Sequence, residues 1–331
     1  MLDIIIPSYK DMEGLYRTLK SVYYSQYKDW ITITVIDDCS NMDYSEVMTD
    51  YPAVQFHILK ENHGPGYVRQ YGIDHTKEPY IFFVDCGDTV VSKYSFLEIK
   101  DTIEEHPEYM IYLWNWIRES GALSGKLTRC TQGWVYSREF LNTYKIRFND
   151  DPIGGRADED VGFNHICSTI IKYLELRDDK QYSHYSAVPI YRKIHNDNSI
   201  TSTNNYSITR HVPGLVSNSI YCMKHLEKCD IDIDTFIEEM NILMFSLYRD
   251  FLRCAKNDTS VLQNHWTLIR KYYYEIYHQY EHLPENEVYI AQNITWYYKE
   301  LRQFVPTPNI RRFLKELKDE EECPQYYYTL R

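Results

Sequence analysis

Residues 80–88 read YIFFVDCGD: five apolar or aromatic residues, then two aspartates that flank Cys86-Gly87. A short run that is apolar at every position is typical of a strand buried on both faces of a sheet. Similar strand patterns lie on both sides of it along the chain and alternate with helical spacing of apolar residues. We expect strands at 2–7, 31–36, 54–60, 80–84 and 109–117, and helices at 12–25, 65–75 and 94–105. This alternation predicts an α/β fold with a mostly parallel, Rossmann-like sheet and helices on both of its faces.

The pattern changes at about residue 206. Beyond it apolar residues keep helical spacing, as in Phe236, Met240, Leu243 and Leu247, and strand patterns are weak. We therefore expect two domains, an α/β domain at 1–205 and a helical domain at 206–331.

The composition is that of a globular chain with an acidic balance. In 331 residues, 48 Asp and Glu against 36 Lys and Arg give a formal charge of −12, which argues against a general nucleic-acid-binding or membrane-binding surface. No apolar run approaches the ~18 residues of a membrane span, and the eight cysteines lack C-x-x-C spacing. We expect reduced thiols, no membrane span and a cytoplasmic location, in the host cytoplasm if the source is viral. The 33 tyrosines are typical of an AT-rich genome, such as that of a virus or a low-GC bacterium.

Polar residues follow four successive predicted strands. They are Pro7-Ser8-Tyr9, Asp37-Asp38-Cys39-Ser40, Glu61-Asn62-His63-Gly64 and Asp85-Cys86-Gly87-Asp88. Because ligands of parallel sheets bind outside the carboxyl ends of the strands, these residues would share one edge. Each alone fits a turn or a helix cap, whereas four together indicate a ligand site.

The glycine pattern excludes two common nucleotide sites. Gly64-x-Gly66 precedes a predicted helix, but Arg69 occupies the place of the third glycine of a dinucleotide motif, and the chain has no P-loop motif. An aspartate-rich edge repels phosphate unless a divalent cation lies between them. The spacing of Asp85 and Asp88 suits one carboxylate for a ribose hydroxyl and one for Mg²⁺ or Mn²⁺, although both could instead cap the next turn.

Six segments, in this order, resemble the inverting family 2 glycosyltransferases, which have the GT-A nucleotide-sugar fold. IIIPSYKDMEGLYRTLKSV (4–22), VIDDCS (35–40), ENHGPGYVRQYGI (61–73) and FFVDCGD (82–88) are similar to the N-terminal half of that family. WVYSREFLNTYKIRF (134–148) and DEDVGFN (158–164) are similar to the acceptor-side segment of its bacterial polysaccharide members. The resemblance implies that residues 1–205 bind a nucleotide sugar and catalyse transfer, while the helical domain makes acceptor or oligomer contacts.

The resemblance assigns roles on the donor side by motif. It implies that Pro7 and Tyr9 frame the nucleotide base and that Asp38, or its neighbour Asp37, holds the base by hydrogen bonds. The remaining donor-side residues are Asn62, Gly64 and Arg69 beside the diphosphate, Asp85 at the ribose or the metal, and Asp88 at the metal.

One position departs from the family pattern. The family usually carries an aspartate two residues after the first one, and here that place is Gly87. Either Asp88 takes over as the ligand of Mg²⁺ or Mn²⁺, or the metal dependence is weak.

On the acceptor side, Glu159 and Asp160 open an amphipathic helical pattern. By spacing alone they fit acidic residues that complement a helix dipole. The resemblance instead implies that Asp160 is the general base for an acceptor hydroxyl and that Glu159 orients the acceptor. Trp134 lies in the acceptor-side motif and is a candidate either for sugar stacking or for the core.

The segment YRKIHNDNSIT (191–201) resembles the loop that closes over the diphosphate in such enzymes. This resemblance makes Arg192 and Ser199 candidate phosphate contacts. His195 is a candidate metal ligand or phosphate donor, with a solvated loop histidine as the alternative.

Together these observations predict a metal-assisted, inverting transferase. It would move a sugar from a nucleotide-diphosphate sugar, by family preference a UDP-sugar, to a hydroxyl group of a glycan. Two alternatives stay open. One is a phage-type enzyme that glycosylates hydroxylated bases in DNA, which requires a local basic groove. The other is a non-catalytic nucleotide-sugar-binding protein, suggested by Gly87.

Overall fold

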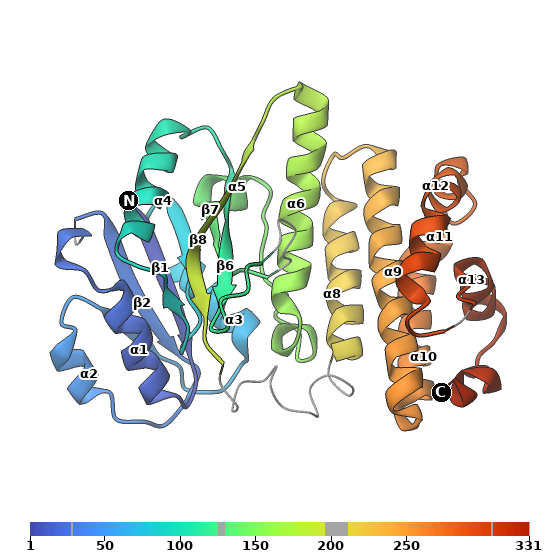
Figure 1. The fold of residues 1–331 in the computed structure, drawn as a ribbon, viewed down its shortest axis with the longest axis horizontal. Helices are drawn as coiled ribbons and strands as arrows, with labels where there is room; N and C mark the ends of the chain where they lie inside the picture. Colours follow the sequence, from blue (N-terminus) through green and yellow to red (C-terminus); the bar gives the residue numbers. More distant parts are fainter. Residues whose placement is uncertain (28, 125–129, 196–210, 306, 331) are drawn as a thin grey trace. The chain divides into compact units, whose positions relative to one another are not determined.

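The computed structural model describes residues 1–27, 29–124, 130–195, 211–305 and 307–330. By packing, the chain forms two compact units, whose elements can be followed in Figure 1. Unit 1 comprises Met1–Arg156 and Leu174–Asp197, and unit 2 comprises Ala157–Tyr173 and Asn198–Arg331. The predicted domain boundary at residue 205, like Ser199, lies outside the described residues.

Unit 1 is built on a mixed, mostly parallel sheet with the strand order β3-β2-β1-β4-β7-β6-β8-β5. The strands are β1 (Leu2–Ser8), β2 (Ile31–Asp37), β3 (Gln55–Ile58), β4 (Tyr80–Phe83), β5 (Thr89–Val90), β6 (Ile111–Arg118), β7 (Trp134–Ser137) and β8 (Ser183–Lys193). Strands β3, β2, β1 and β4 are parallel, as are β6 and β8, whereas β7 runs antiparallel to both of its neighbours and β5 antiparallel to β8. The α/β class predicted from the sequence is confirmed.

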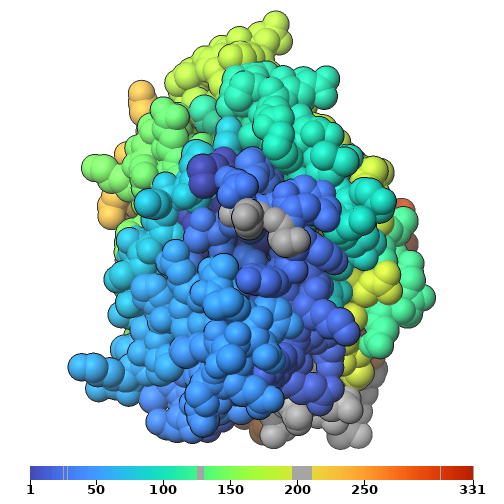
Figure 2. Space-filling model, turned by 90° about the vertical axis from the view of Figure 1, so that its left-hand side faces the viewer, coloured from blue at the N-terminus to red at the C-terminus, as the bar shows by residue number. Residues whose placement is uncertain are grey.

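Helices pack on both faces of this sheet. The helices confined to unit 1 are α1 (Met12–Val22), α2 (Ser45–Asp50), α3 (Pro65–His75), α4 (Tyr94–Glu105) and α5 (Arg138–Thr143). Alternate residues of β1 face opposite sides, so that Ile4 and Ile6 join the core cluster that contains Leu15 of α1. Ile5 faces the other side, where Gly72 of α3 lies so close that a Cβ on it would come within 2.5 Å of the Ile5 side chain. Figure 2 looks onto the side of unit 1 where much of the surface comes from the first part of the chain, coloured blue to cyan.

Three strands of unit 1, β5, β7 and β8, are not predicted by the sequence, and β5 has only two residues. β7 has only four residues, which is too short for periodicity to separate it from a helix or a turn. β8 contains Pro189, and its pairing with β6 shifts in register on either side of Asn115, the partner of that proline. Arg192, which the resemblance places in a loop, lies in β8, so this part of the prediction is corrected.

The described part of unit 2 is helical, as predicted. Its elements are the first part of α6 (Glu159–Asp178), α8 (His211–Leu226), α9 (Ile233–Asn257), α10 (Leu262–Tyr272), a π-helical turn (Tyr273–Tyr277), α11 (His278–Tyr280), α12 (Pro284–Leu301) and α13 (Ile310–Asp319). Its core is rich in aromatic side chains such as Trp266, Phe313 and Tyr272, which are fully buried. Within the residues that the structure describes, no helix is long and apolar enough to cross a membrane.

Candidate active site

The carboxyl ends of three parallel strands meet at one edge of the sheet in unit 1. Ser8 at the end of β1 pairs with Asp37 at the end of β2, and Ile5 of β1 pairs with Phe83 at the end of β4. The segments that follow these strands therefore begin along one edge, as the strand-end argument predicts. Pro7 lies within β1, and Tyr9 just beyond it is 46% exposed.

Asp37 shapes the turn after β2 rather than facing solvent. It is 1% exposed, and its carboxylate accepts hydrogen bonds from the Ser40 backbone N–H at 2.9 Å, from the Ser40 hydroxyl and from the Tyr44 hydroxyl at 2.6 Å. These bonds hold a turn in which Cys39 and Asn41 have positive φ. The buried carboxylate of Asp37 is thus engaged within this turn.

Asp38 clamps the loop that enters α3. One carboxylate oxygen accepts from the His63 N–H at 2.8 Å, and the other accepts from the Gly64 N–H at 2.8 Å and from the Asn62 side chain at 2.7 Å. Gly64 has φ +93°, a conformation that favours glycine, and ends the loop at the first residue of the helix, Pro65. The predicted residues Asp38, Asn62 and Gly64 are therefore brought together.

Arg156 completes this loop from a distant segment. Its guanidinium donates to the Asn62 side-chain oxygen at 2.7 Å and to the Asn62 carbonyl at 2.6 Å. Gly66 packs against the segment before Arg156, since a Cβ on it would lie 2.8 Å from the Asn149 carbonyl oxygen. Sequence reasoning misses Arg156, because no local pattern links it to a loop 94 residues earlier.

Arg69 and Asp85 form an ion pair at the end of β4. The guanidinium Nη2 lies 2.7 Å from Asp85 Oδ1, and the Gln132 side chain donates to Asp85 Oδ2 at 2.7 Å. Burial alone would raise the pKa of Asp85, but the charge and hydrogen bond of Arg69 outweigh it and hold the pKa below its ordinary value. Asp85 is thus an ionised carboxylate with a protein donor on each oxygen. Gln132 was not predicted from the sequence.

Asp88 lies in a contrasting environment only three residues further. It is 7% exposed, and it accepts hydrogen bonds from the Tyr191 hydroxyl at 2.6 Å and the Ile194 N–H at 2.8 Å. Burial, followed by the negative charge of Asp85, raises the pKa of Asp88 to about 7. The turn between the two aspartates is held by Thr18, which accepts from the Gly87 N–H and donates to the Asp88 carbonyl. Gly87 has φ +96°, so the departure from the family pattern coincides with a backbone conformation that disfavours aspartate.

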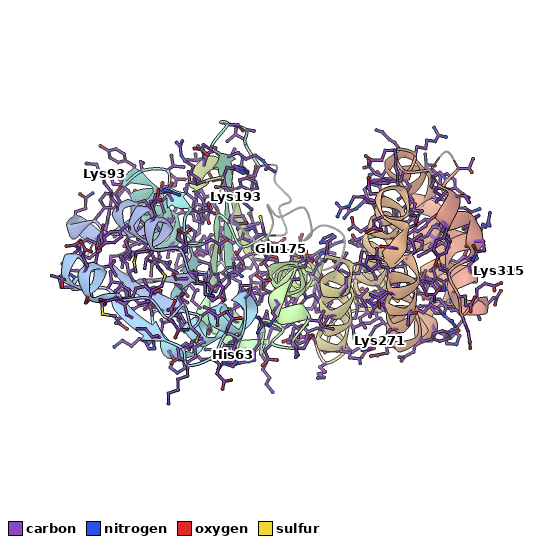
Figure 3. All side chains as sticks on the ribbon, turned by 90° about the horizontal axis from the view of Figure 1, so that it is seen from below. His63, Lys93, Glu175, Lys193, Lys271 and Lys315 are labelled. Atoms are coloured by element: carbon purple, nitrogen blue, oxygen red, sulfur yellow. The ribbon has the colours of Figure 1, made fainter. Side chains whose placement is uncertain are left out.

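The end of β8 supplies positive charge to this pair. Lys193, labelled in Figure 3, lowers the pKa of both Asp85 and Asp88 through its charge. Arg192 precedes it and pairs in register with Thr89 of β5. His195 is exposed beyond the strand, and its backbone N–H lies 3.3 Å from Glu119 Oε2. Lys193, like Arg156 and Gln132, is a residue that sequence reasoning misses.

A divalent cation fits part of this arrangement. Within the described ranges, no group of three or more His, Cys, Asp or Glu side chains is placed to hold a metal ion. Mg²⁺ and Mn²⁺ can nevertheless be held by one or two carboxylates together with substrate phosphates. Asp88 suits such an ion, because its buried anion is disfavoured beside Asp85 and a cation would relieve that cost. Asp85 suits it less, because Arg69 and Gln132 already donate to its two oxygens.

The acidic residues at the start of α6 belong to unit 2. Glu159 is 7% exposed, whereas Asp160 is intermediate in exposure and is the more accessible of the two. Asp158 has φ +56°, and its carbonyl accepts hydrogen bonds from the N–H groups of Val161 and Gly162. The left-handed Asp158 therefore sets the direction of the first turn that carries Asp160.

Trp134 occupies a core position. It is 5% exposed in β7, and its ring stacks against Tyr136 with 5.9 Å between the ring centroids. A sugar ring needs an open aromatic face, so the expectation that Trp134 stacks on a sugar is corrected in favour of its core alternative.

Comparison with known proteins places this geometry in a family. Residues 3–158 match the model of glycosyl transferase family 2, which confirms the family indicated by the sequence motifs. The matched segment contains the donor-side strand ends from Pro7 to Asp88. Over residues 3–158 the chain accordingly resembles the glycosyltransferases of this family. Among curated proteins, none matches the sequence.

Solved structures share the fold over most of the chain. The first 349 residues of TarS from S. aureus, in complex with UDP, superpose with a TM-score of 0.65 at 14% identity, covering 92% of this chain and 90% of that one. The same protein in complex with UDP-GlcNAc gives a TM-score of 0.55 at 14% identity, covering 99% and 89%. A longer TarS structure gives 0.63 at 13% identity, covering 91% of this chain and 55% of that one. These similarities confirm the GT-A fold.

Proposed function

We propose that this chain transfers a sugar, with inversion, from a uridine-diphosphate sugar to a hydroxyl group of a glycan. The observation that carries the proposal is the pair Asp85 and Asp88, adjacent carboxylates whose surroundings move their pKa values in opposite directions. Such a separation is typical of acidic groups with different tasks in one site. Here one stays ionised beside Arg69, and the other is suited to a cation.

The donor would lie along the edge formed by the ends of β1, β2 and β4. Pro7 and Tyr9 would frame the base, and Asp38 with Asn62 would keep the loop before α3 in place beside it. Arg69, Asp85 and Arg192 would face the ribose and the diphosphate. Uridine is the nucleotide of choice because two structures with the same fold are complexes with UDP and UDP-GlcNAc.

Asp88 would hold Mn²⁺ or Mg²⁺, with His195 as a further candidate ligand. When bound, the ion neutralises the charge that develops on the diphosphate leaving group.

Asp160 would act as the general base. Its carboxylate would remove the proton of the acceptor hydroxyl as that oxygen bonds to the anomeric carbon and the bond from this carbon to the diphosphate oxygen breaks. Attack from the face opposite the leaving group inverts the anomeric centre. General-base assistance of this kind contributes ~10²–10⁴-fold. Glu159 would orient the acceptor, and its low exposure limits it to contacts at the end of the helix.

A glycan is the acceptor that the overall charge favours. With a formal charge of −12, the chain has no general attraction for a polyanion such as DNA. Transfer to hydroxylated DNA bases would replace the glycan as the acceptor. Nucleotide-sugar binding without any transfer would replace the proposed reaction.

The test combines donor binding with one substitution. The thermal midpoint is measured with UDP and UDP-GlcNAc, each with and without Mn²⁺, for the parent and for Asp160→Asn. A ligand at 100 times its Kd adds ~2.7 kcal/mol to the free energy of unfolding, which is readily seen. We expect Asp160→Asn to keep the midpoint shift and to lose transfer to glycan acceptors. The exposed Asp179 gives a matched control, Asp179→Asn, which should keep both. Equal transfer by Asp160→Asn and the parent would refute the assignment of the base.

A further inference from the structure

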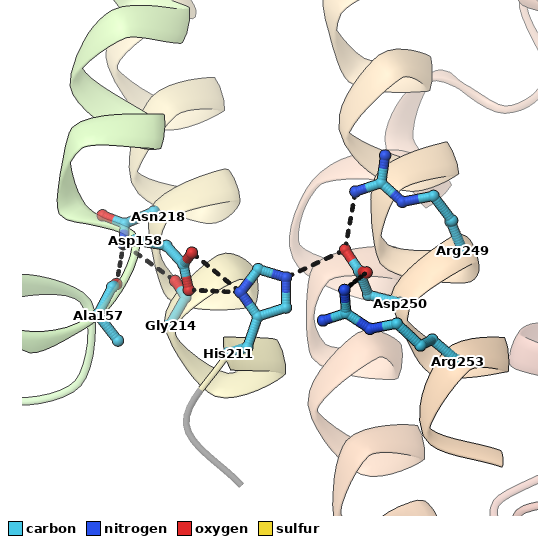
Figure 4. Close-up of polar contacts among 8 residues, drawn as sticks. All are labelled: Ala157, Asp158, His211, Gly214, Asn218, Arg249, Asp250 and Arg253. Atoms are coloured by element: carbon cyan, nitrogen blue, oxygen red, sulfur yellow. Dashed lines mark hydrogen bonds and ion pairs between the residues drawn. The ribbon is translucent and has the colours of Figure 1, made fainter. Parts of the chain in front are cut away.

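Unit 2 contains a buried ionic network that the proposed reaction does not use. Its centre is His211, the first residue of α8 (Figure 4). Nδ1 of His211 lies 2.9 and 3.0 Å from the two carboxylate oxygens of Asp158, and Nε2 lies 3.2 Å from Oδ2 of Asp250 in α9. Arg249 and Arg253 approach Asp250 from the side away from His211, at 2.9 and 3.6 Å.

The network is charged at neutral pH. A carboxylate accepts hydrogen bonds and does not donate them, so both ring nitrogens of His211 must carry a proton. Burial alone would lower the pKa of His211, but the bonds to Asp158 and Asp250 raise it to about 9. Asp250 is 1% exposed, and although burial alone would raise its pKa, His211 and Arg249 lower it to about 2. An imidazolium therefore lies between two carboxylates.

Stability alone does not account for such an arrangement. Buried ion pairs often contribute no more than well-packed apolar residues of the same volume, and their best-attested use is to fix one geometry. Here the residue that is fixed is Asp158, whose φ of +56° is uncommon outside glycine, asparagine and aspartate.

The same face of α8 also holds the backbone next to Asp158. Asn218 donates to the Ala157 carbonyl at 2.9 Å, and Gly214 lies so close that a Cβ on it would meet the Ala157 carbonyl oxygen at 2.6 Å. His211, Gly214 and Asn218 are spaced three and four residues apart and so share one side of the helix. α8 thus contacts the backbone of Ala157 and the side chain of Asp158, which lies two residues before Asp160.

We infer that His211 is a positioning residue for Asp160: by holding the Asp158 carboxylate against Asp250, it fixes the left-handed residue that starts α6 and so aims the Asp160 carboxylate at the acceptor hydroxyl. The inference rests on the proposed role of Asp160 as the base. His211 itself would contact neither the nucleotide sugar nor the acceptor.

Two readouts test the inference on the full chain. The first is hydrogen exchange of the amides at 157–163, which needs no substrate. We expect His211→Gln and Asp158→Asn each to speed exchange there at least tenfold. The second is steady-state hydrolysis of UDP-GlcNAc with Mn²⁺, in which water takes the place of the acceptor hydroxyl and GlcNAc and UDP are released. Since small misplacements of a reacting group cost up to ~10²-fold, kcat should fall 10- to 100-fold while KM for the donor changes less than twofold.

Three controls separate positioning from general destabilisation. His265→Gln alters a different histidine of unit 2, one that is fully buried, and it should leave both the exchange at 157–163 and kcat unchanged. His211→Arg restores a cation with donors on several sides and should recover most of kcat. The double variant His211→Gln with Asp158→Asn should lose no more kcat than either single variant, because both substitutions disrupt the same contact between His211 and Asp158.

The outcomes are distinct from those that test the base. Unchanged exchange at 157–163 in His211→Gln, an equal effect of His265→Gln, or additive losses in the double variant would overturn the inference. Asp160→Asn is measured in parallel. If it abolishes UDP release and His211→Gln does not lower it, only the inference fails; if Asp160→Asn retains full activity, the assigned base itself is wrong.

Discussion

Arg69 and Asp85 are joined at 2.7 Å although they belong to different elements, the middle of α3 and the end of β4. The pair places one positive and one negative group of the donor edge in a fixed relation before any ligand binds. It also means that neither residue can be changed without effect on the other.

Removing the guanidinium should weaken both the fold and the donor site. Arg69→Met leaves Asp85 with the hydrogen bond from the Gln132 side chain. Breaking a fully buried pair costs ~3–5 kcal/mol, and because the Asp85 side chain is 29% exposed we expect about half of that. Urea unfolding measures the loss, and the UDP-induced midpoint shift should shrink in parallel. Arg147→Met, which breaks an exposed pair with Asp74, is the control and should cost under ~1 kcal/mol.

Gly64, in the loop before α3, can be compared with Gly121, which follows β6 and has a similar backbone conformation. Gly64 has φ +93° and Gly121 has φ +83°, so alanine is strained at both. A Cβ on Gly64 would also lie 2.6 Å from Cγ of Arg156, whereas a Cβ on Gly121 meets nothing within 4 Å. We expect Gly64→Ala to destabilise more than Gly121→Ala and, unlike it, to abolish the UDP-induced shift. Equal UDP shifts in the two variants would show that the loop does not hold the donor.

Asp88 should be required for the metal-dependent part of donor binding. Asparagine can accept from the Ile194 N–H and meet the Tyr191 hydroxyl, so Asp88→Asn should keep the free energy of unfolding within ~1 kcal/mol. The additional midpoint shift that Mn²⁺ gives in the presence of UDP should disappear. Persistence of the full metal-dependent shift would assign the ion to other residues.

Stability of unit 2 should depend on pH through His211 and Asp250. The pKa of His211 is raised from 6.5 to about 9, so its contribution is complete below pH 6.5 and is lost as the pH rises through 9. The pKa of Asp250 is lowered from 3.8 to about 2, so its contribution is complete above pH 3.8 and is lost as the pH falls through 2. The difference in unfolding free energy between the parent and His211→Gln, measured in urea, should therefore be largest near pH 5–6 and should decline above pH 6.5. A difference that stays constant to pH 10 would argue against an imidazolium.

Much of unit 1 is predictable because its early strands are apolar and separated by clear helices. The predicted helix at 65–75 matches α3, the strand ends make Asp38, Asp85 and Asp88 candidates, and the family resemblance adds Arg69. Their partners are not predictable in this way. Gln132, Tyr191 and Arg156 lie 47, 103 and 94 residues from the residues they contact, in short or irregular segments without periodicity. The burial of Asp37 and Trp134 likewise depends on tertiary packing.

The division of α6 between the two units has a consequence for any exchange of parts among related enzymes. Phe163, Ile166 and Ile170 of its first half are fully buried, and His165 pairs with Glu239 of α9. A chain cut after residue 205 would leave this half without the helices it packs on, and a foreign helical bundle joined there would meet a mismatched surface. The boundaries between the two compact units fall instead between Arg156 and Ala157 and between Tyr173 and Leu174. An exchange that keeps unit 2 intact therefore has to move the segment that bears Asp160 together with the C-terminal helices, although residues 174–197 of unit 1 separate the two along the chain.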